Sequence, residues 1–228
     1  MLNGRRVPDA ERAEASTMRG AVRHVEWVGD EDPERLEAAV VTFAPDRLDA
    51  LGTSRTTDYV TSWALETGPD WVTSRLSVAV DGRGFTRWLV LTRDGHGRWE
   101  SESYTHGDDR YHEEPMAAPG IADPSGLGGA LDCDLALCPV TNTMPILRLG
   151  ALQGLEETEL TMAWVDLPSL EVVASRQAYS AAHPFDPEAG RAIVRYRSVG
   201  SGFTADLGVD EDGLVIDYPR LARRIRTR

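Results

Sequence analysis

Apolar and polar residues alternate with a period of two in several stretches of this chain, and this pattern constrains the fold more than any other feature. It is clearest in residues 59–67, 72–80 and 203–209. Because successive side chains of a β-strand point to opposite faces, each stretch is typical of a strand with one buried face. Helical periodicity is scarce by comparison. We therefore predict a mainly β protein built on an antiparallel sheet.

Asp-Gly pairs connect several of the alternating stretches. Asp81-Gly82, Asp94-Gly95 and Asp212-Gly213 each lie between two such stretches, which is a strong local signal for a β-hairpin. Together with weaker candidates, the pattern predicts about ten strands in up-and-down order. A sheet of that width curls, so we expect a single curled antiparallel sheet, either a spiral β-roll or an open half-barrel. The further strands are expected at residues 36–43, 85–93, 131–135, 160–165, 172–179, 192–199 and 214–218.

Four segments do not follow the strand pattern. Residues 44–56 are expected to form a short helix or a loop, and residues 104–130, rich in Pro and Gly, a long loop. Residues 219–228 begin with Pro219, which suits the first position of a short C-terminal helix, and Asp217 is expected to cap that helix. Residues 1–20 are expected to be a disordered extension, and residues 21–228 a single β-roll domain.

Composition excludes several classes of function. A net charge of −13 disfavours binding to nucleic acid or to anionic membranes. No signal peptide or transmembrane segment is apparent, so we expect a cytoplasmic protein. The two cysteines, Cys133 and Cys138, are too far apart on an extended strand for a disulfide and are expected to be free buried thiols. No sequence motif indicates a metal or a cofactor, and none is expected.

The densest group of polar residues within an apolar run lies in residues 131–149. Asp132 and Asp134 are two positions apart, so on a strand both carboxylates would point to one face, about 6.6–7 Å apart. Arg148 follows in an Ile-Leu-Arg-Leu run and needs an acidic partner or an anionic ligand. Either these charges satisfy one another in a buried network, which is the favoured interpretation, or they form the floor of a binding site.

Further candidate ligand-binding residues surround this group. Thr141, Asn142 and Thr143 could bind sugar hydroxyls, or could instead bond their own backbone in a turn before a proline. Arg75 lies on the polar side of the strand at residues 72–80, which faces either solvent or a polar cavity. Six tryptophans are spread through the expected strands, mostly as core residues.

These motifs resemble the putative glycolipid-binding family. The resemblance is carried first by Leu-Asp-x-Asp-Leu at residues 131–135, followed by Pro-x-Thr-Asn-Thr-x-Pro-Ile at residues 139–146. It continues in residues 164–172 with Gln177-Ala178-Tyr179, and in residues 203–207 with 213–219. In this chain Val140 replaces a phenylalanine of the family pattern, and Leu147 replaces an arginine. The resemblance covers roughly residues 20–226 and adds Tyr179 to the candidate ligand-binding residues.

The resemblance implies a spiral β-roll with a concave apolar surface, similar to lipoprotein carriers and lipid-binding lipoproteins. The leading hypothesis is non-enzymatic binding of an amphipathic ligand, such as a glycolipid or fatty-acyl compound. An enzyme acting on a sugar conjugate, with Asp132 and Asp134 as acid–base pair or metal ligands, is the first alternative. The second is an interaction module that docks a partner at a sheet edge.

Overall fold

One large curled sheet dominates the structure, a computed structural model that describes residues 20–227. The sheet is open and contains 15 strands, in the order β11-β12-β13-β14-β15-β16-β17-β1-β2-β3-β4-β5-β6-β7, with β10 paired to β13. Neighbours from β12 to β7 along this order are antiparallel, whereas β11 runs parallel to β12 and β10 parallel to β13. The mainly β class and the curled open sheet are confirmed. The expectation of about ten strands, all antiparallel, is wrong.

The first and last strands, β1 and β17, pair with each other in the middle of the open sheet. The strands of the larger sheet that precede the β8–β9 hairpin of residues 110–115 are β1 (Val22–Gly29), β2 (Leu36–Ala44), β3 (Arg47–Arg55), β4 (Tyr59–Thr67), β5 (Thr73–Gly82), β6 (Phe85–Arg93) and β7 (Trp99–Gly107). Those that follow are β10 (Gly120–Ile121), β11 (Asp132–Leu135), β12 (Thr158–Val165), β13 (Glu171–Asp186), β14 (Arg191–Ser198), β15 (Thr204–Val209), β16 (Val215–Tyr218) and β17 (Ala222–Thr227).

The remaining elements are short. A separate two-stranded sheet consists of β8 (Arg110–Tyr111) and β9 (Glu114–Pro115). The helical segments are the 3-10 turns η1 (Pro69–Trp71), η2 (Pro124–Leu127) and η3 (Pro139–Asn142) and the α-helix α2 (Thr143–Arg148).

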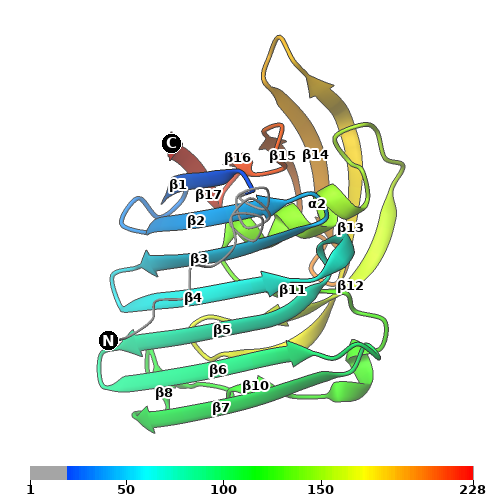
Figure 1. Cartoon of the computed structure of the whole chain (residues 1–228). Helices are drawn as coiled ribbons and strands as arrows, with labels where there is room; N and C mark the ends of the chain where they lie inside the picture. The colour runs from blue at the N-terminus through cyan, green and yellow to red at the C-terminus, as the bar shows by residue number, and fades with distance from the viewer. Residues whose placement is uncertain (1–19, 228) are drawn as a thin grey trace, which may run out of the picture.

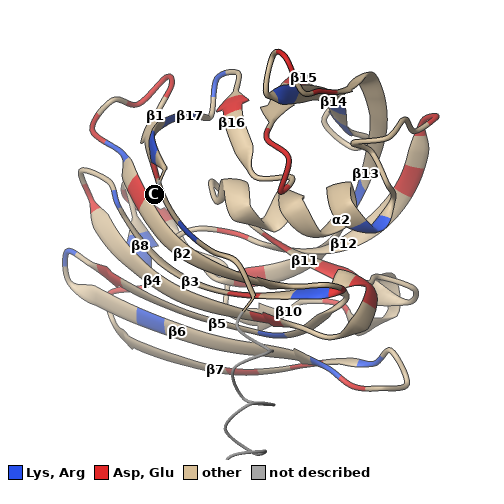
Figure 2. Cartoon of the chain, turned by 45° about the horizontal axis from the view of Figure 1, so that its top comes forward, with Lys and Arg blue, Asp and Glu red and all other residues tan. Residues whose placement is uncertain are grey.

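The sheet curls so that its β11 end lies inside the roll, against the inner face of the first strands (Figures 1 and 2). At this contact the backbone N–H of Cys133 donates to the Thr73 hydroxyl on β5, at 3.1 Å. Successive residues of β11 point to opposite sides of the strand. The Cys133 side chain therefore faces β5, while Asp132 and Asp134 face the opposite side of β11, toward η3 and α2.

The helix α2 fills the concavity of the roll (Figure 2). A helix of six residues is too short to be stable alone, so tertiary packing holds it. Thr143 to Ile146 are buried, and the Thr143 hydroxyl donates to the Gly213 carbonyl at 3.3 Å, in the turn between β15 and β16. Gly213 has a φ of +75°, and a side chain there would meet Leu147 of α2 at 3.0 Å. The glycine thus permits both the turn and the close contact with the helix.

Several local expectations are wrong. Residues 47–55, expected as helix or loop, form β3, and the C-terminal segment forms β17 rather than a helix. Asp217 lies on β16 and pairs with Arg191 at 3.4 Å instead of capping a helix. Residues 104–130 contain the end of β7, the β8–β9 hairpin, β10 and η2 rather than one long loop. Both cysteines are free and buried, as predicted. The expected disordered extension at residues 1–20 falls almost entirely outside the described residues.

Candidate ligand-binding pocket

Asp132 forms a closed ion pair with Arg148, the last residue of α2. The Arg148 guanidinium donates to both oxygens of the carboxylate, with Nη1 to Oδ1 at 2.5 Å. The Asp132 side chain is fully buried, and that of Arg148 is 13% exposed. Burial raises the pKa of Asp132, an effect that Arg148 opposes. This pair is the internal partner expected for Arg148, and it ties α2 to β11.

Asp134 has a different environment, because its hydrogen-bond partners are uncharged. The Thr141 hydroxyl donates to its Oδ1 at 2.9 Å, and Gln177 Nε2 donates to its Oδ2 at 2.6 Å. Burial raises the pKa of Asp134, and these two hydrogen bonds oppose the shift. The network continues from Gln177 to Tyr179, whose hydroxyl lies 3.1 Å from Gln177 Oε1 and 3.0 Å from Asn142 Oδ1.

Asp134 and Asn142 line a cavity of about 790 Å³ between the η3–α2 segment and strands β12–β14. We call it the Asp134 pocket. In the β-ladder Asp134 is the register partner of Trp164, and Trp164 that of Val173, so their side chains share the pocket face. Its other lining residues are Leu135, Ala136, Leu137, Cys138, Ala174, Ser175, Arg176, Tyr196, Ser198, Val199, Gly200, Ser201, Phe203, Tyr218 and Leu221.

Three aromatic side chains form one wall of the Asp134 pocket. Tyr196 and Tyr218 meet edge to face with ring centroids 5.9 Å apart, and Phe203 stacks on Tyr218 at 6.4 Å. Behind them, Tyr179 packs edge to face on Tyr196 at 5.5 Å. Tyr179 thereby connects the aromatic wall to the polar network at Asp134. The pocket therefore combines an apolar aromatic surface with a small group of fixed polar atoms, as small-molecule sites usually do.

A buried arginine holds the rim of the pocket in place. Arg35 Nη1 donates to the Leu137 carbonyl at 2.8 Å, and Nη2 donates to the Leu221 carbonyl. The same guanidinium lies 3.3 Å from Glu37, whose side chain is 2% exposed. Burial raises the pKa of Glu37 to about 7, although Cys138 and Arg35 both act in the opposite direction. Arg35 thus fixes two lining residues from behind.

The structure brings most of the predicted site residues together. Asp134 and Asn142 line the pocket, and Thr141 and Tyr179 bond to them from behind. Asp132 and Arg148 lie in the same network but are bonded to each other. The side chain of Thr143 instead points to the β15–β16 turn.

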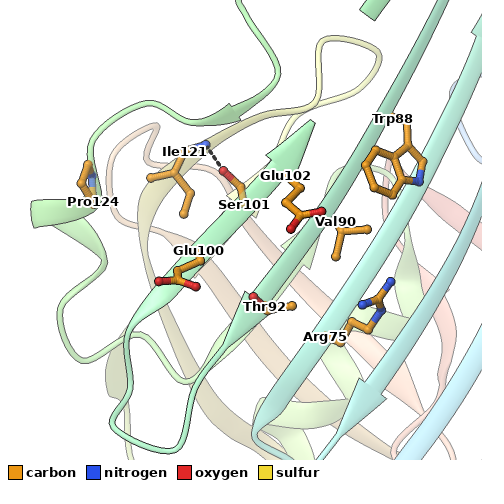
Figure 3. Close-up of a pocket in the computed structure, with 9 residues that line it drawn as sticks. All are labelled: Arg75, Trp88, Val90, Thr92, Glu100, Ser101, Glu102, Ile121 and Pro124. Carbon is orange, nitrogen blue, oxygen red and sulfur yellow. Dashed lines mark hydrogen bonds between the residues drawn. The ribbon is translucent and has the colours of Figure 1, made fainter. Parts of the chain in front are cut away.

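Arg75 lies elsewhere, in a second cavity of about 540 Å³ on the outer face of β5–β7 (Figure 3). Its neighbours there include Trp88, Thr92 and Glu102. Ser101, at the edge of this cavity, accepts a hydrogen bond from the Ile121 N–H at 3.1 Å. This second cavity contains no other predicted site residue, and it is separate from the polar network on α2 and β11.

Sequence reasoning missed the aromatic wall. Phe203 was expected on a strand and Tyr218 at a strand end, but neither was singled out, and Tyr196 has no distinctive motif around it. The alternation of β14 places Tyr196 on the inner face, which was the available signal. Which inner-face residues line a pocket and which fill the core depends on the curl of the sheet.

Among residues 20–227, no helix is long and apolar enough to cross a membrane. Within the same range, no group of three or more His, Cys, Asp or Glu side chains is arranged to hold a metal ion.

The fold and the pocket define an open spiral β-roll that encloses a helix and carries a part-aromatic, part-polar pocket beside it. The sequence comparison is specific: the family described as "Putative glycolipid-binding" matches residues 24–224. The chain belongs to this family.

A solved structure has the same architecture. The chain is similar to the crystal structure of a DUF1089 family protein from Pseudomonas aeruginosa, at 30% sequence identity and a TM-score of 0.61. The match covers 83% of this chain and 92% of the other. No curated protein matches the chain significantly.

Proposed function

We propose that this protein binds one amphipathic molecule, such as a glycolipid or fatty-acyl compound, in the Asp134 pocket and does not catalyse a reaction on it. The observation that carries the proposal is the pocket itself. Its volume of about 790 Å³ lies within the usual range for small-molecule sites, roughly 300–1,000 Å³. Its walls combine aromatic and aliphatic side chains with a polar group at Asp134 and Asn142, which matches a molecule with one apolar and one polar end.

The enzymatic alternative has less support. Glycoside hydrolysis by paired carboxylates requires that both reach the sugar, one as an acid and the other as a base or nucleophile. Asp132 is fully buried and bonded through both oxygens to Arg148. Only Asp134 lines the pocket, so the pair does not present two accessible carboxylates.

The interaction-module alternative would use the edge strand β7. Its outer residues include Glu100 and Glu102, and charged side chains on an edge strand disfavour pairing with another strand. In addition, the Ser103 hydroxyl donates to the Pro119 carbonyl at 3.1 Å, which brings the segment before β10 against this edge. We therefore favour ligand binding over sheet-edge docking.

The test is binding of dodecyl β-D-glucoside, a soluble glycolipid analogue, measured by isothermal titration calorimetry below its critical micelle concentration. The wild-type chain should bind one molecule. Ser175→Trp places a large ring on the pocket face and should abolish binding, whereas Ser77→Trp, on the outer face of β5, should not alter it. Circular dichroism spectra of both variants serve as the control for folding.

Two results would contradict the proposal. One is the absence of binding by the wild-type chain, both for this probe and for lipids retained on native mass spectrometry. The other is equal loss of binding in the two tryptophan variants, which would locate the probe outside the pocket.

A further inference from the structure

We infer that the Asp134 pocket selects an amphiphile with an uncharged, hydroxyl-bearing headgroup and rejects the same amphiphile when its headgroup is anionic. The inference rests on the proposed function and specifies the chemical class of the ligand. It comes from the distribution of charge around the pocket. Among residues 20–227, no cation bonds to the Asp134 carboxyl group in the pocket wall, and no cationic side chain of the wall is directed toward the ligand.

The one cationic residue among the pocket-lining residues is directed away from the pocket. Arg176 lies on β13, where Ser175 and Gln177 carry the inner-face side chains. The side chain of Arg176 therefore points to the outer face, and its guanidinium donates there to Glu159. Arg176 therefore lines the pocket with its backbone, and its carbonyl accepts a hydrogen bond from the Val199 N–H at 2.9 Å.

Three further arginines lie near the pocket, and an acidic partner holds each of them. Arg148 is bonded to Asp132 through both terminal nitrogens of its guanidinium. Arg35 is 3% exposed and contacts Glu37 and two backbone carbonyls, so a ligand cannot reach it. Arg220 lies over the Phe203 ring at 5.5 Å but does not line the pocket; its side chain is 65% exposed and pairs at the surface with Glu31 at 2.9 Å.

By contrast, the groups that do line the pocket suit hydroxyls. Asn142 Oδ1 accepts from Tyr179, which leaves Nδ2 as a donor without a partner among the described residues. The Ser201 hydroxyl, which also lines the pocket, donates to the Ser198 hydroxyl at 2.9 Å. The half-buried Asp134 carboxyl can accept from a ligand hydroxyl in addition to its two protein donors. Alcohol groups both donate and accept, so they can satisfy donors and acceptors of this kind together.

An anionic headgroup would lose its hydration in this pocket and gain no opposite charge in return. Burying a charge without a partner is unfavourable, and a nearby like charge adds to the cost. Protonation of Asp134, whose pKa is raised by burial, would remove the repulsion but would still supply no attraction. The chain's net charge of −13 disfavours the approach of an anion as well.

The test compares two probes that differ at a single substituent, which is a neutral alcohol in one and an anion in the other. Dodecyl β-D-glucoside and dodecyl β-D-glucuronide share the chain and the sugar ring, and differ in a CH₂OH group against a carboxylate at C6. Calorimetry at pH 8 should give at least tenfold tighter binding of the glucoside to the wild-type chain. Asp134→Asn keeps the side-chain shape and should lower the ratio of glucoside affinity to glucuronide affinity at least threefold. Asp206→Asn removes an equivalent charge from the outer face of β15, opposite to the pocket face, and should leave the ratio unchanged.

The outcomes separate the two proposals. If the wild-type chain binds both probes equally, the charge selection is wrong while ligand binding in the pocket stands. If it binds neither probe, the proposed function fails and the selection fails with it. A ratio that falls equally in Asp134→Asn and Asp206→Asn would assign the discrimination to the net charge of the chain rather than to Asp134. The wild-type ratio decides the inference even if Asp134→Asn does not fold.

Discussion

Substitution of Arg148 by Met tests whether Asp132 belongs to a buried network or to an open site. Methionine keeps most of the apolar side-chain volume and removes the guanidinium. The Asp132 side chain is fully buried, so the substitution leaves a buried carboxylate without its cation. Breaking a buried ion pair in this way costs about 3–5 kcal/mol. We expect Arg148→Met to lower the free energy of unfolding by that amount, because no other arginine in residues 20–227 bonds to Asp132.

A double-mutant cycle separates the pair from the individual residues. Asp132→Asn removes the charge on the other side, and the double variant leaves no charge to bury. The double variant should lose much less stability than the sum of the single variants, with a coupling energy of about 2 kcal/mol or more. Urea denaturation, followed by both tryptophan fluorescence and circular dichroism, gives the free energies of unfolding.

The pH dependence supplies an independent check. Burial already raises the pKa of Asp132, and removal of Arg148 raises it further. The folded Arg148→Met chain then binds a proton at Asp132 at a pH where the unfolded chain does not, so its stability increases as the pH falls. The free energy of unfolding of Arg148→Met should therefore lie closer to that of the wild-type chain at pH 5 than at pH 8. A loss below about 1 kcal/mol that is the same at both pH values would refute the closed ion pair.

Three further predictions follow from individual buried positions. Gly52→Ala should cost about 1–3 kcal/mol in urea denaturation, because the added methyl carbon would lie 2.4 Å from a Trp63 ring carbon, whereas Gly95→Ala, with open space around it, should be neutral. Burial raises the pKa of Glu37 from 4.5 to about 7, so the folded chain binds a proton there more tightly than the unfolded chain does. The stabilisation that results is fully present below pH 4.5 and is lost as the pH rises through 7. The loss in the wild-type chain is at most roughly 3 kcal/mol, and Glu37→Gln should abolish it. Melting temperatures at pH 5 and pH 8 test this, and the same change of melting temperature with pH in both chains would contradict the raised pKa of Glu37. Burial raises the pKa of Cys133 to about 12, and both free cysteines should react with Ellman's reagent at pH 8 only after urea is added; reaction in the folded state would show that the thiols are accessible.

Local pattern predicted the strands where one face is buried and the other is exposed. Residues 59–67 and 85–93 form β4 and β6 with the predicted bounds. The pattern failed where the buried face lacks typical strand formers. Residues 47–55, expected as a short helix or a loop, do have one buried face, but Leu48, Ala50 and Gly52 on it are a weak local signal for a strand. Pairing with β2 on one side and with β4 on the other makes this segment a strand, and that is a tertiary effect.

The polar group at residues 132–148 was predictable in composition but not in its division of roles. Its sequence contains two aspartates and one arginine, and the charges alone favour a buried pair. They do not say which aspartate takes the arginine. The position of α2 in the concavity brings Arg148 to Asp132 and leaves Asp134 to Thr141 and Gln177. That position depends on contacts with the β15–β16 turn, about 70 residues away.

The sequence by itself determined the mainly β class, most strand positions, the family and most residues of the polar network, though not Gln177, because each of these depends on neighbours along the chain. The tertiary structure decided the number of strands, the pairing of β17 with β1, and the existence of a pocket beside Asp134. The aromatic wall combines Tyr196, Phe203 and Tyr218 from separate segments of the chain. Such a site exists only after the sheet curls, since curvature brings together residues that no local pattern relates.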